Sequence, residues 1–223
     1  MKLVSMVKVV FVSVVMSWGA ASAQFGLGAD VVSRYVWRGT DFGNAASVQP
    51  YISYTAGILE VGAWGSYSIM PVDGGYENDL YVTLSQGPVS ITVTDYYFPN
   101  MEAGMDEFFK YGEDDNGASY HFIEASGTFT QGPLSLLAGV FLTNDDDNSL
   151  YFEGAYEAYA KDDVTASVFV GGGNGAYTLE DAGDDDSFNV VNVGLTVAKD
   201  MFSASYILNP DAKITFIVFG VSF

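Results

Sequence analysis

Ile217-Val218-Phe219-Gly220-Val221-Ser222-Phe223 ends the chain, and large apolar residues recur at every second position of this stretch. A period of two is the pattern of a β-strand, in which successive side chains point to opposite faces. A strand of this kind that closes on phenylalanine is typical of bacterial outer-membrane β-barrels, whose outward faces are apolar. We therefore take Phe219, Val221 and Phe223 as a candidate assembly signal, which the barrel-assembly machinery would read.

The first 23 residues predict export from the cytoplasm. Lys2 and Lys8 form a basic start, Val9 to Met16 form a short apolar run, and Ala21-Ser22-Ala23 supplies a small-residue cleavage site. The alternative, an N-terminal membrane anchor, would need about 20 consecutive apolar residues, and this run is much shorter. We expect a signal peptide that is removed on export, followed by a mature chain that starts at Gln24.

The mature chain, residues 24–223, has the length of one all-β domain. The whole chain has 8 basic and 28 acidic residues, and two of the basic ones leave with the signal peptide, so the mature formal charge is 6 − 28 = −22. This charge excludes nucleic acid as a partner. The chain has no cysteine, so disulfides, thiolate metal sites and thiol nucleophiles are excluded as well.

Alternation and aromatic or β-branched residues predict twelve strands, most of them close to the ~9–11 residues that a tilted membrane-spanning strand needs. The predicted strands are 26–38, 47–56, 58–68, 76–86, 88–98, 118–131, 133–143, 149–160, 164–172, 187–198, 202–209 and 213–223. Tight turns alternate with longer connections along this series. Such alternation indicates an antiparallel up-and-down barrel with periplasmic turns at one rim and extracellular loops at the other.

Acidic residues are concentrated in the longer connections, whereas Lys161 and Lys199 lie in tight turns. Within the strands, large apolar side chains share one parity, and the few charges share the other parity with small residues. No polar cover remains for the outside of such a barrel, so we expect its apolar face to meet lipid. Aromatic residues at the strand ends then fit an interfacial girdle. These residues are Tyr35, Trp37, Tyr54 and Tyr67.

Several ordered pieces of residues 28–125 resemble a proteobacterial family assigned as porins, the TorF-type or Gcw-type proteins. The pieces are Ser33-Arg34-Tyr35-Val36-Trp37-Arg38-Gly39, Val48-Gln49-Pro50, Gly62-Ala63-Trp64-Gly65-Ser66, Glu77-Asn78-Asp79-Leu80-Tyr81 and Asp95-Tyr96-Tyr97-Phe98-Pro99. The resemblance implies an outer-membrane barrel assigned to transport, and it carries no catalytic motif. It is weaker in the C-terminal half of the chain.

Strand parity places six acidic residues and two arginines on the inner face of the barrel. These candidate pore-lining residues are Asp30, Arg34, Arg38, Glu60, Asp79, Glu124, Glu153 and Glu157. One interpretation is a polar, net-negative pore with an arginine pair on one wall, which would focus the electric field across a constriction. The other is that Arg34 and Arg38 pair with Glu60 and its neighbours to brace a plugged interior. A slip of one residue in register would invert either assignment.

Neither catalysis nor a specific metal site is expected. His121 is the only histidine, and its parity with Ile123 points it away from the lumen, so a serine–histidine–acid arrangement has no suitable base. Two runs of aspartate could attract Ca²⁺ or Mg²⁺ loosely, but they lack the spacing of known calcium loops. These weak divalent candidates are Asp145, Asp146, Asp147, Asp184, Asp185 and Asp186. We expect no cofactor.

The sequence thus predicts an outer-membrane porin for passive diffusion of small hydrophilic solutes, with a preference for cations. Twelve strands lie between eight-stranded barrels, which side chains fill, and 16-stranded porins with wide channels. The alternative is a closed barrel with a structural or surface role, in contact with lipopolysaccharide or divalent ions. An inward-folded loop 99–117 would favour gating, whereas packing of Trp64, Tyr81 and arginine–glutamate pairs would favour the closed barrel. The oligomeric state stays open.

Overall fold

The computed structural model describes residues 23–70, 76–99, 108–112, 120–145, 148–178 and 187–223. The predicted signal peptide therefore lies outside the described residues, apart from its last position. Most of the acidic loop positions lie outside them too, including five of the six weak divalent candidates. Within the described ranges, no helix is long and apolar enough to cross a membrane.

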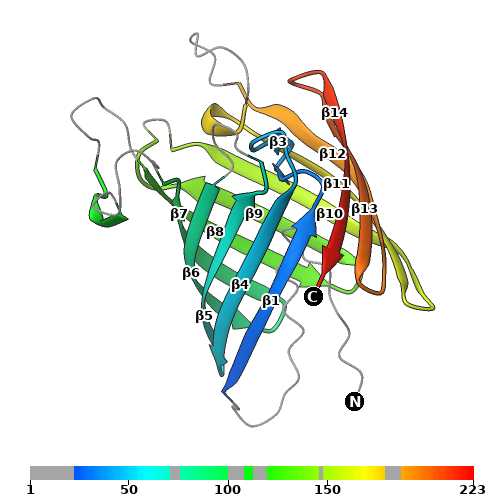
Figure 1. Ribbon diagram of the computed structural model, residues 1–223, viewed down its shortest axis with the longest axis horizontal. Helices are drawn as coiled ribbons and strands as arrows, with labels where there is room; N and C mark the ends of the chain where they lie inside the picture. The colour runs from blue at the N-terminus through cyan, green and yellow to red at the C-terminus, as the bar shows by residue number, and fades with distance from the viewer. Residues whose placement is uncertain (1–22, 71–75, 100–107, 113–119, 146–147, 179–186) are drawn as a thin grey trace.

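Twelve strands form one closed antiparallel barrel, as the sequence predicted (Figure 1). Each strand pairs with its neighbours along the chain, and β1 closes the ring by pairing with β14. The barrel strands are β1 Gln24–Val32, β4 Ser47–Ala56, β5 Leu59–Ser68, β6 Tyr76–Gln86, β7 Val89–Tyr97, β8 His121–Gln131, β9 Leu134–Phe141, β10 Leu150–Lys161, β11 Val164–Gly173, β12 Asn189–Lys199, β13 Phe202–Asn209 and β14 Ile214–Ser222. Eleven of them lie within a few residues of the predicted strands.

The chain end forms the seam of the barrel. Val31 pairs with Val221, and the backbone N–H of Phe223 donates to the carbonyl oxygen of Ala29 at 2.9 Å. Phe219 and Phe223 project from the outer face, with 60% and 70% of their surface exposed. The alternating C-terminal strand therefore closes the backbone hydrogen bonding, as a barrel requires, and its apolar side chains stay outside.

The two faces of the barrel differ in chemistry. Large apolar side chains cover the outside, and Leu27, Ile52 and Ile91 each expose more than half of their surface. The inside carries small hydroxyl side chains that pair between neighbouring strands. These pairs are Thr83 with Thr92, Thr130 with Ser135 and Thr196 with Ser205, at 2.8 to 3.0 Å. An apolar outside around a polar inside is the arrangement of a barrel that stands in lipid.

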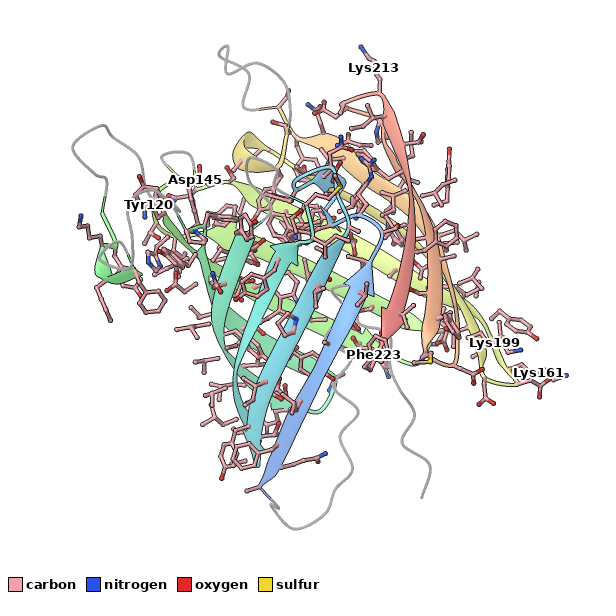
Figure 2. All side chains as sticks on the ribbon, viewed as in Figure 1. Tyr120, Asp145, Lys161, Lys199, Lys213 and Phe223 are labelled. Carbon is pink, nitrogen blue, oxygen red and sulfur yellow. The ribbon has the colours of Figure 1, made fainter. Side chains whose placement is uncertain are left out.

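Tight turns and longer connections lie at opposite ends of the barrel. In the turn between β10 and β11, Asp162 and Asp163 both have positive φ angles, 52° and 62°, which suit a two-residue hairpin turn. Lys161 and Lys199 lie at the end where the chain terminates, whereas Asp145 lies at the end with the longer connections (Figure 2). We call these the turn end and the loop end.

The first predicted strand, 26–38, is wrong in its C-terminal part. β1 ends at Val32, and residues 33–46, which we call the inward segment, fold into the barrel at the loop end (Figure 1). Within the inward segment, β2 (Val36–Trp37) pairs with β3 (Thr40–Asp41) as a small hairpin. Val36 and Trp37 do form a strand, but it pairs within this hairpin and not with the barrel wall.

Two of the four predicted girdle residues lie on the outer face, and two lie in the interior. Tyr54 and Tyr67 lie on the outer face, with 37% and 40% of their surface exposed. Tyr35 is only 5% exposed and Trp37 packs against the buried aromatic cluster of the interior. The inward segment therefore carries two of the four predicted girdle residues into the barrel.

Candidate functional site

The tip of the inward segment is a two-residue turn built from Arg38 and Gly39. Both residues have positive φ angles, 49° and 82°, which the favoured two-residue hairpin turns require. A Cβ atom on Gly39 would lie 1.9 Å from the carbonyl oxygen of Val191, so only glycine allows this approach. Asn209 donates from Nδ2 to the carbonyl oxygen of Gly39 at 3.1 Å and fixes the tip from β13.

A bulge in β12 prepares the wall for this contact. The pairing of β11 with β12 shifts between Gly171 and Gly172, and Val191 is the extra residue on β12. Val191 and Asn192 are consecutive, yet both are buried on the inner side. A bulge re-aims side chains in this way, and here it brings the backbone of Val191 against the hairpin tip.

Arg38 forms a buried ion pair with Glu124 of β8. Its Nη1 donates to Oε2 of Glu124, and its Nη2 donates to Oε1 at 3.0 Å. Only 8% of the arginine side chain and 1% of the glutamate side chain are exposed. The hydroxyl of Tyr177 donates to the same carboxylate at 2.7 Å, and the hydroxyl of Tyr96 lies 3.5 Å from it. Two parallel bonds between charged partners give this contact both strength and orientation.

Three aromatic rings surround the guanidinium of Arg38. Its Cζ lies 4.4 Å from the ring centre of Trp37, 4.4 Å from that of Tyr151 and 5.1 Å from that of Tyr177. Burial alone would lower the pKa of Arg38, but attraction to Glu124 outweighs burial and raises the pKa above its ordinary value. Burial likewise raises the pKa of the Tyr177 hydroxyl, with the Glu124 charge adding to it. Arg38 is therefore a permanent cation in a dry aromatic cage.

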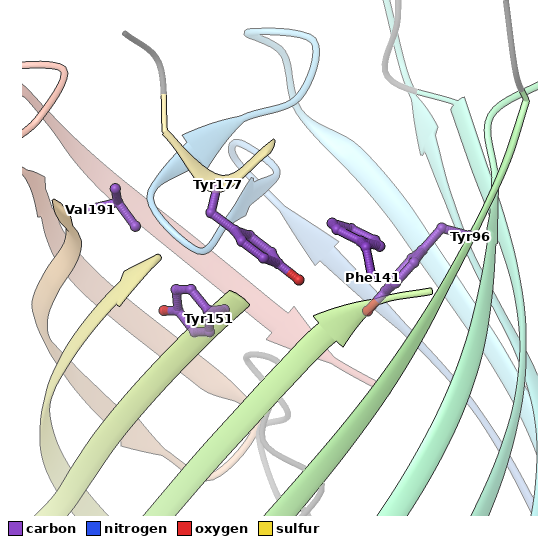
Figure 3. Packing of buried hydrophobic residues seen from close by; sticks show 5 residues of the cluster. All are labelled: Tyr96, Phe141, Tyr151, Tyr177 and Val191. Atoms are coloured by element: carbon purple, nitrogen blue, oxygen red, sulfur yellow. The ribbon is translucent and has the colours of Figure 1, made fainter. Parts of the chain in front are cut away.

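The aromatic cluster around this cage comes from separate parts of the wall. Tyr96 (β7), Phe141 (β9) and Tyr151 (β10) converge with Tyr177 of the short 3-10 turn Gly175–Tyr177 (Figure 3). The rings of Phe141 and Tyr177 stack at 5.1 Å with an interplanar angle of 13°. Most of these rings therefore belong to wall strands, and the inward segment adds Trp37 to them.

The inward segment also contacts the remaining walls. Tyr35 packs on Trp64 of β5 at 5.5 Å between ring centres, and burial beside Glu77 and Asp79 raises the pKa of its hydroxyl. Arg34 pairs with Asp41 inside the segment and lies over the ring of Phe216 in β14. Through Arg38 and Gly39 the segment also contacts β8, β10, β12 and β13. It therefore reaches walls on all sides of the lumen, which it crosses at the loop end.

The two predicted arginines do face the interior, but from the inward segment and not from the wall of β1. Their partners are Asp41 and Glu124, and not Glu60, which the plugged-interior interpretation had chosen. Glu60 instead accepts hydrogen bonds from Thr55 at 3.0 Å and from Tyr81 at 3.1 Å. The packing of Trp64 and Tyr81 and the arginine–glutamate pair, which were expected of a blocked lumen, are thus present.

The other predicted pore residues have different surroundings. Glu153 accepts hydrogen bonds from Tyr151 and, at 2.7 Å, from Asn192. Asp79 is 7% exposed, whereas Glu157 is exposed near the turn end. Asp30 of β1 is partly buried opposite Gln49. Of the predicted set, Arg38 and Glu124 contact each other directly.

Sequence reasoning missed Glu77 and the aromatic cage. Glu77 is 3% exposed and lies two positions before Asp79 on the same strand, so the parity that selected Asp79 would also have selected Glu77. Tyr151 shares the inner parity of Glu153 in the same way. Tyr177 had no such signal, because it lies in a connection and not in a strand.

His121 lies on the outer parity, as predicted, but it is completely buried there. Tyr111 and Tyr97 stack on its two sides at 4.2 and 4.5 Å, and its Nδ1 lies 2.8 Å from Oδ1 of Asp95. A hydrogen bond to Asp95 raises the pKa of the Tyr111 hydroxyl. An inward fold of loop 99–117 would have favoured gating, but its described residues 108–112 pack against outer-parity side chains. The segment that enters the lumen is residues 33–46.

Asp145 is the weak divalent candidate that the structure describes. Its Oδ2 accepts a hydrogen bond from the backbone N–H of Ser149 at 2.6 Å, which shapes the turn before β10. Asp146, Asp147, Asp184, Asp185 and Asp186 lie outside the described residues. Among the residues that are described, no group of three acidic or histidine side chains could hold a metal ion.

No known protein family, curated protein or solved structure matches this chain. Chemically, the site is a carboxylate in an aromatic cage on the lumen wall, occupied by an arginine of the inward segment.

Proposed function

We propose that this chain is an outer-membrane channel for small hydrophilic solutes, favouring cations, whose resting lumen is blocked by the inward segment. The apolar outer face supports a place in lipid, and the sequence resemblance to TorF-type porins supports the same membrane. The observation that carries the proposal is the ion pair between Arg38 and Glu124, because it holds a connection, and not a wall strand, across the lumen.

A permanently closed barrel does not require such a segment. Apolar side chains from the wall could fill its interior without the desolvation penalty of a buried ion pair. The inner face here instead carries small residues such as Ser53, Thr128 and Ser205. Acidic side chains on the same face, Glu60 and Glu153 among them, would favour cations over anions once water enters.

The second candidate is the closed barrel with a structural or surface role. It is favoured by the same block, because the inward segment contacts walls on every side of the lumen and buries its arginine. The two candidates differ in one property. A channel must conduct when the segment leaves, whereas a structural barrel need not.

The test is to shorten the inward segment and measure conductance in a planar bilayer. Val32 pairs directly with Ser47, so a short Gly-Ser linker can join β1 to β4 when residues 34–45 are removed. We expect rare, small openings from the wild type and a stable open level from the shortened barrel, with a cation-selective reversal potential in a salt gradient. A folded, heat-modifiable shortened barrel that never conducts would leave only the structural candidate.

A further inference from the structure

The cage around Arg38 resembles a ligand site more than a structural contact. Its wall components are Glu124, Tyr151 and Tyr96, which belong to three strands, and Tyr177 adds a ring from the 3-10 turn. Arg38 and Trp37 are the parts that the inward segment brings. With the segment in place, only 1% of the Glu124 side chain is exposed. If the segment leaves, this carboxylate remains beside the aromatic rings of the wall without its cation. Such a carboxylate strongly favours any cation that can replace arginine.

We propose that this cage is a binding site for the guanidinium group of a cationic solute, and that Arg38 is its resident internal ligand. The inference rests on the proposed function, because the solute would reach the cage through the lumen. A guanidinium-bearing solute would compete with Arg38 and so hold the inward segment away from the wall. The site would then couple recognition of the solute to opening of the lumen.

Geometry selects guanidinium over a simple ammonium ion. Both carboxylate oxygens of Glu124 are engaged by two nitrogens of Arg38, which a planar fork achieves and a point charge does not. The flat group also lies close to the rings of Tyr151, at 4.4 Å, and Tyr177, at 5.1 Å, neither of which belongs to the inward segment. Cations over aromatic faces gain more when water is excluded, as it is here.

The net negative charge of the chain also favours the binding of a cation. The mature protein carries a formal charge of −22, so cations are concentrated near it in dilute salt. Further into the site, Glu153 lies beside Tyr151 and Asn192 and adds a second carboxylate near the cage. A solute with one guanidinium and a second cationic or hydrogen-bonding group would therefore find partners for both.

The first test empties the cage and offers a substitute. Arg38→Ala is refolded in detergent in a Trp64→Phe background, which leaves Trp37 as the single tryptophan of the mature chain. We expect methylguanidinium at millimolar concentration to change the Trp37 emission saturably and to raise the Tm. Methylammonium should bind at least about tenfold more weakly, which is the factor that one charge-assisted hydrogen bond supplies.

Two variants serve as controls for this experiment. Adding Glu124→Gln to Arg38→Ala should abolish the methylguanidinium effect, because the anchoring charge is gone. Arg34→Ala removes the same kind of side chain from the same segment, but Arg34 is 33% exposed and pairs outside the cage. Methylguanidinium should leave that variant unchanged, and an equal effect there would mean general ion binding and would overturn the proposal.

The second test distinguishes a binding site for a solute from a contact that only holds the inward segment in place. The barrel without residues 34–45 keeps Glu124, Tyr151 and Tyr177 but has no internal ligand. Methylguanidinium should block its current and raise its Tm, and Glu124→Gln should remove both effects. Conductance without block or stabilisation would overturn the guanidinium site and leave the channel proposal standing. If methylguanidinium raised the Tm through Glu124 in a shortened barrel that does not conduct, the guanidinium site would be supported and the channel proposal refuted.

Discussion

Arg38 and Glu124, 86 positions apart in the chain, form a two-bonded ion pair inside the barrel with almost no contact with water. The pair ties the connection after β1 to β8, on the far side of the lumen. Removing one partner of a buried ion pair commonly costs about 3–5 kcal/mol, because the other charge is left uncompensated. The ion pair therefore stabilises the seated position of the inward segment, and loss of either charge should strongly disfavour that position.

Gly39→Val should unseat the inward segment without harming the barrel. Any Cβ at this position would meet the carbonyl oxygen of Val191 at 1.9 Å, so the hairpin tip cannot reach the wall. We expect frequent channel openings in a planar bilayer and unchanged heat modifiability. The matched control is Gly87→Val, which has a similar positive φ of 58° in a turn with open space around it. Equal conductance from both variants would mean that backbone strain alone is responsible.

Strongly alkaline solution should loosen the inward segment through Tyr177. Burial raises the pKa of this hydroxyl above the value of about 10 in an unfolded chain, so its contribution is complete below pH 10. The contribution is lost as the pH rises through the folded-state pKa, because an ionised tyrosine cannot donate to Glu124. We expect a red shift of Trp37 emission in this range, in a Trp64→Phe background. Tyr177→Phe should reduce the shift, leaving the part due to the other tyrosines near Trp37, and an unchanged profile would rule out the assignment.

Deleting Phe223 should lower the amount of barrel in the outer membrane. Phe223 extends the pairing of the last strand with β1 through Ala29, and its ring is 70% exposed on the outer face. Loss of this residue removes both the seam contact and the terminal aromatic group that the assembly machinery is expected to read. Phe25→Ala is the control, since Phe25 is 75% exposed on the same face but lies in β1. Normal levels of the deleted chain, measured in membrane fractions, would count against the outer-membrane assignment.

The two rims should be distinguishable on intact cells. A protease-cleavable tag beside Asp145, at the loop end, should be cut from outside, whereas a tag at Gly132, at the turn end, should be protected. The reason is that barrels of this kind keep their short turns in the periplasm. Permeabilised cells provide the control for tag accessibility. Cleavage at Gly132 on unpermeabilised cells would invert the proposed orientation.

The barrel itself could be predicted because its signals are local and repeated. Strands such as Leu59–Ser68 and Tyr76–Gln86 alternate clearly, and each has a tight turn with glycine at one end, so their faces follow from parity. The alternation of the C-terminal strand correctly predicted which of its side chains face outward, including that of Phe223. Each of these inferences needs only the residues of one strand and its turn.

A plugged interior was one of two interpretations of the sequence, but the path of the inward segment could not be predicted, because it depends on contacts between distant parts of the chain. Residues 33–38 alternate as well as any wall strand, and only the Arg38-Gly39 turn marks a hairpin. Nothing local to Glu124 indicates that its partner is an arginine 86 positions away. The bulge at Val191, which receives the hairpin tip, is also invisible without the pairing of β11 and β12.

Single-channel conductance of Glu124→Gln tests the central claim most directly. Glutamine keeps the shape of the side chain but removes its charge, so Arg38 would be left as a buried, uncompensated cation. Glu60→Gln is the matched control, because Glu60 also lies on the inner face but bonds to Thr55 and Tyr81 and not to the inward segment. We predict long openings from Glu124→Gln, and rare openings from both Glu60→Gln and the wild type. A wild type that already conducts at the level of Glu124→Gln would contradict a lumen blocked by the inward segment.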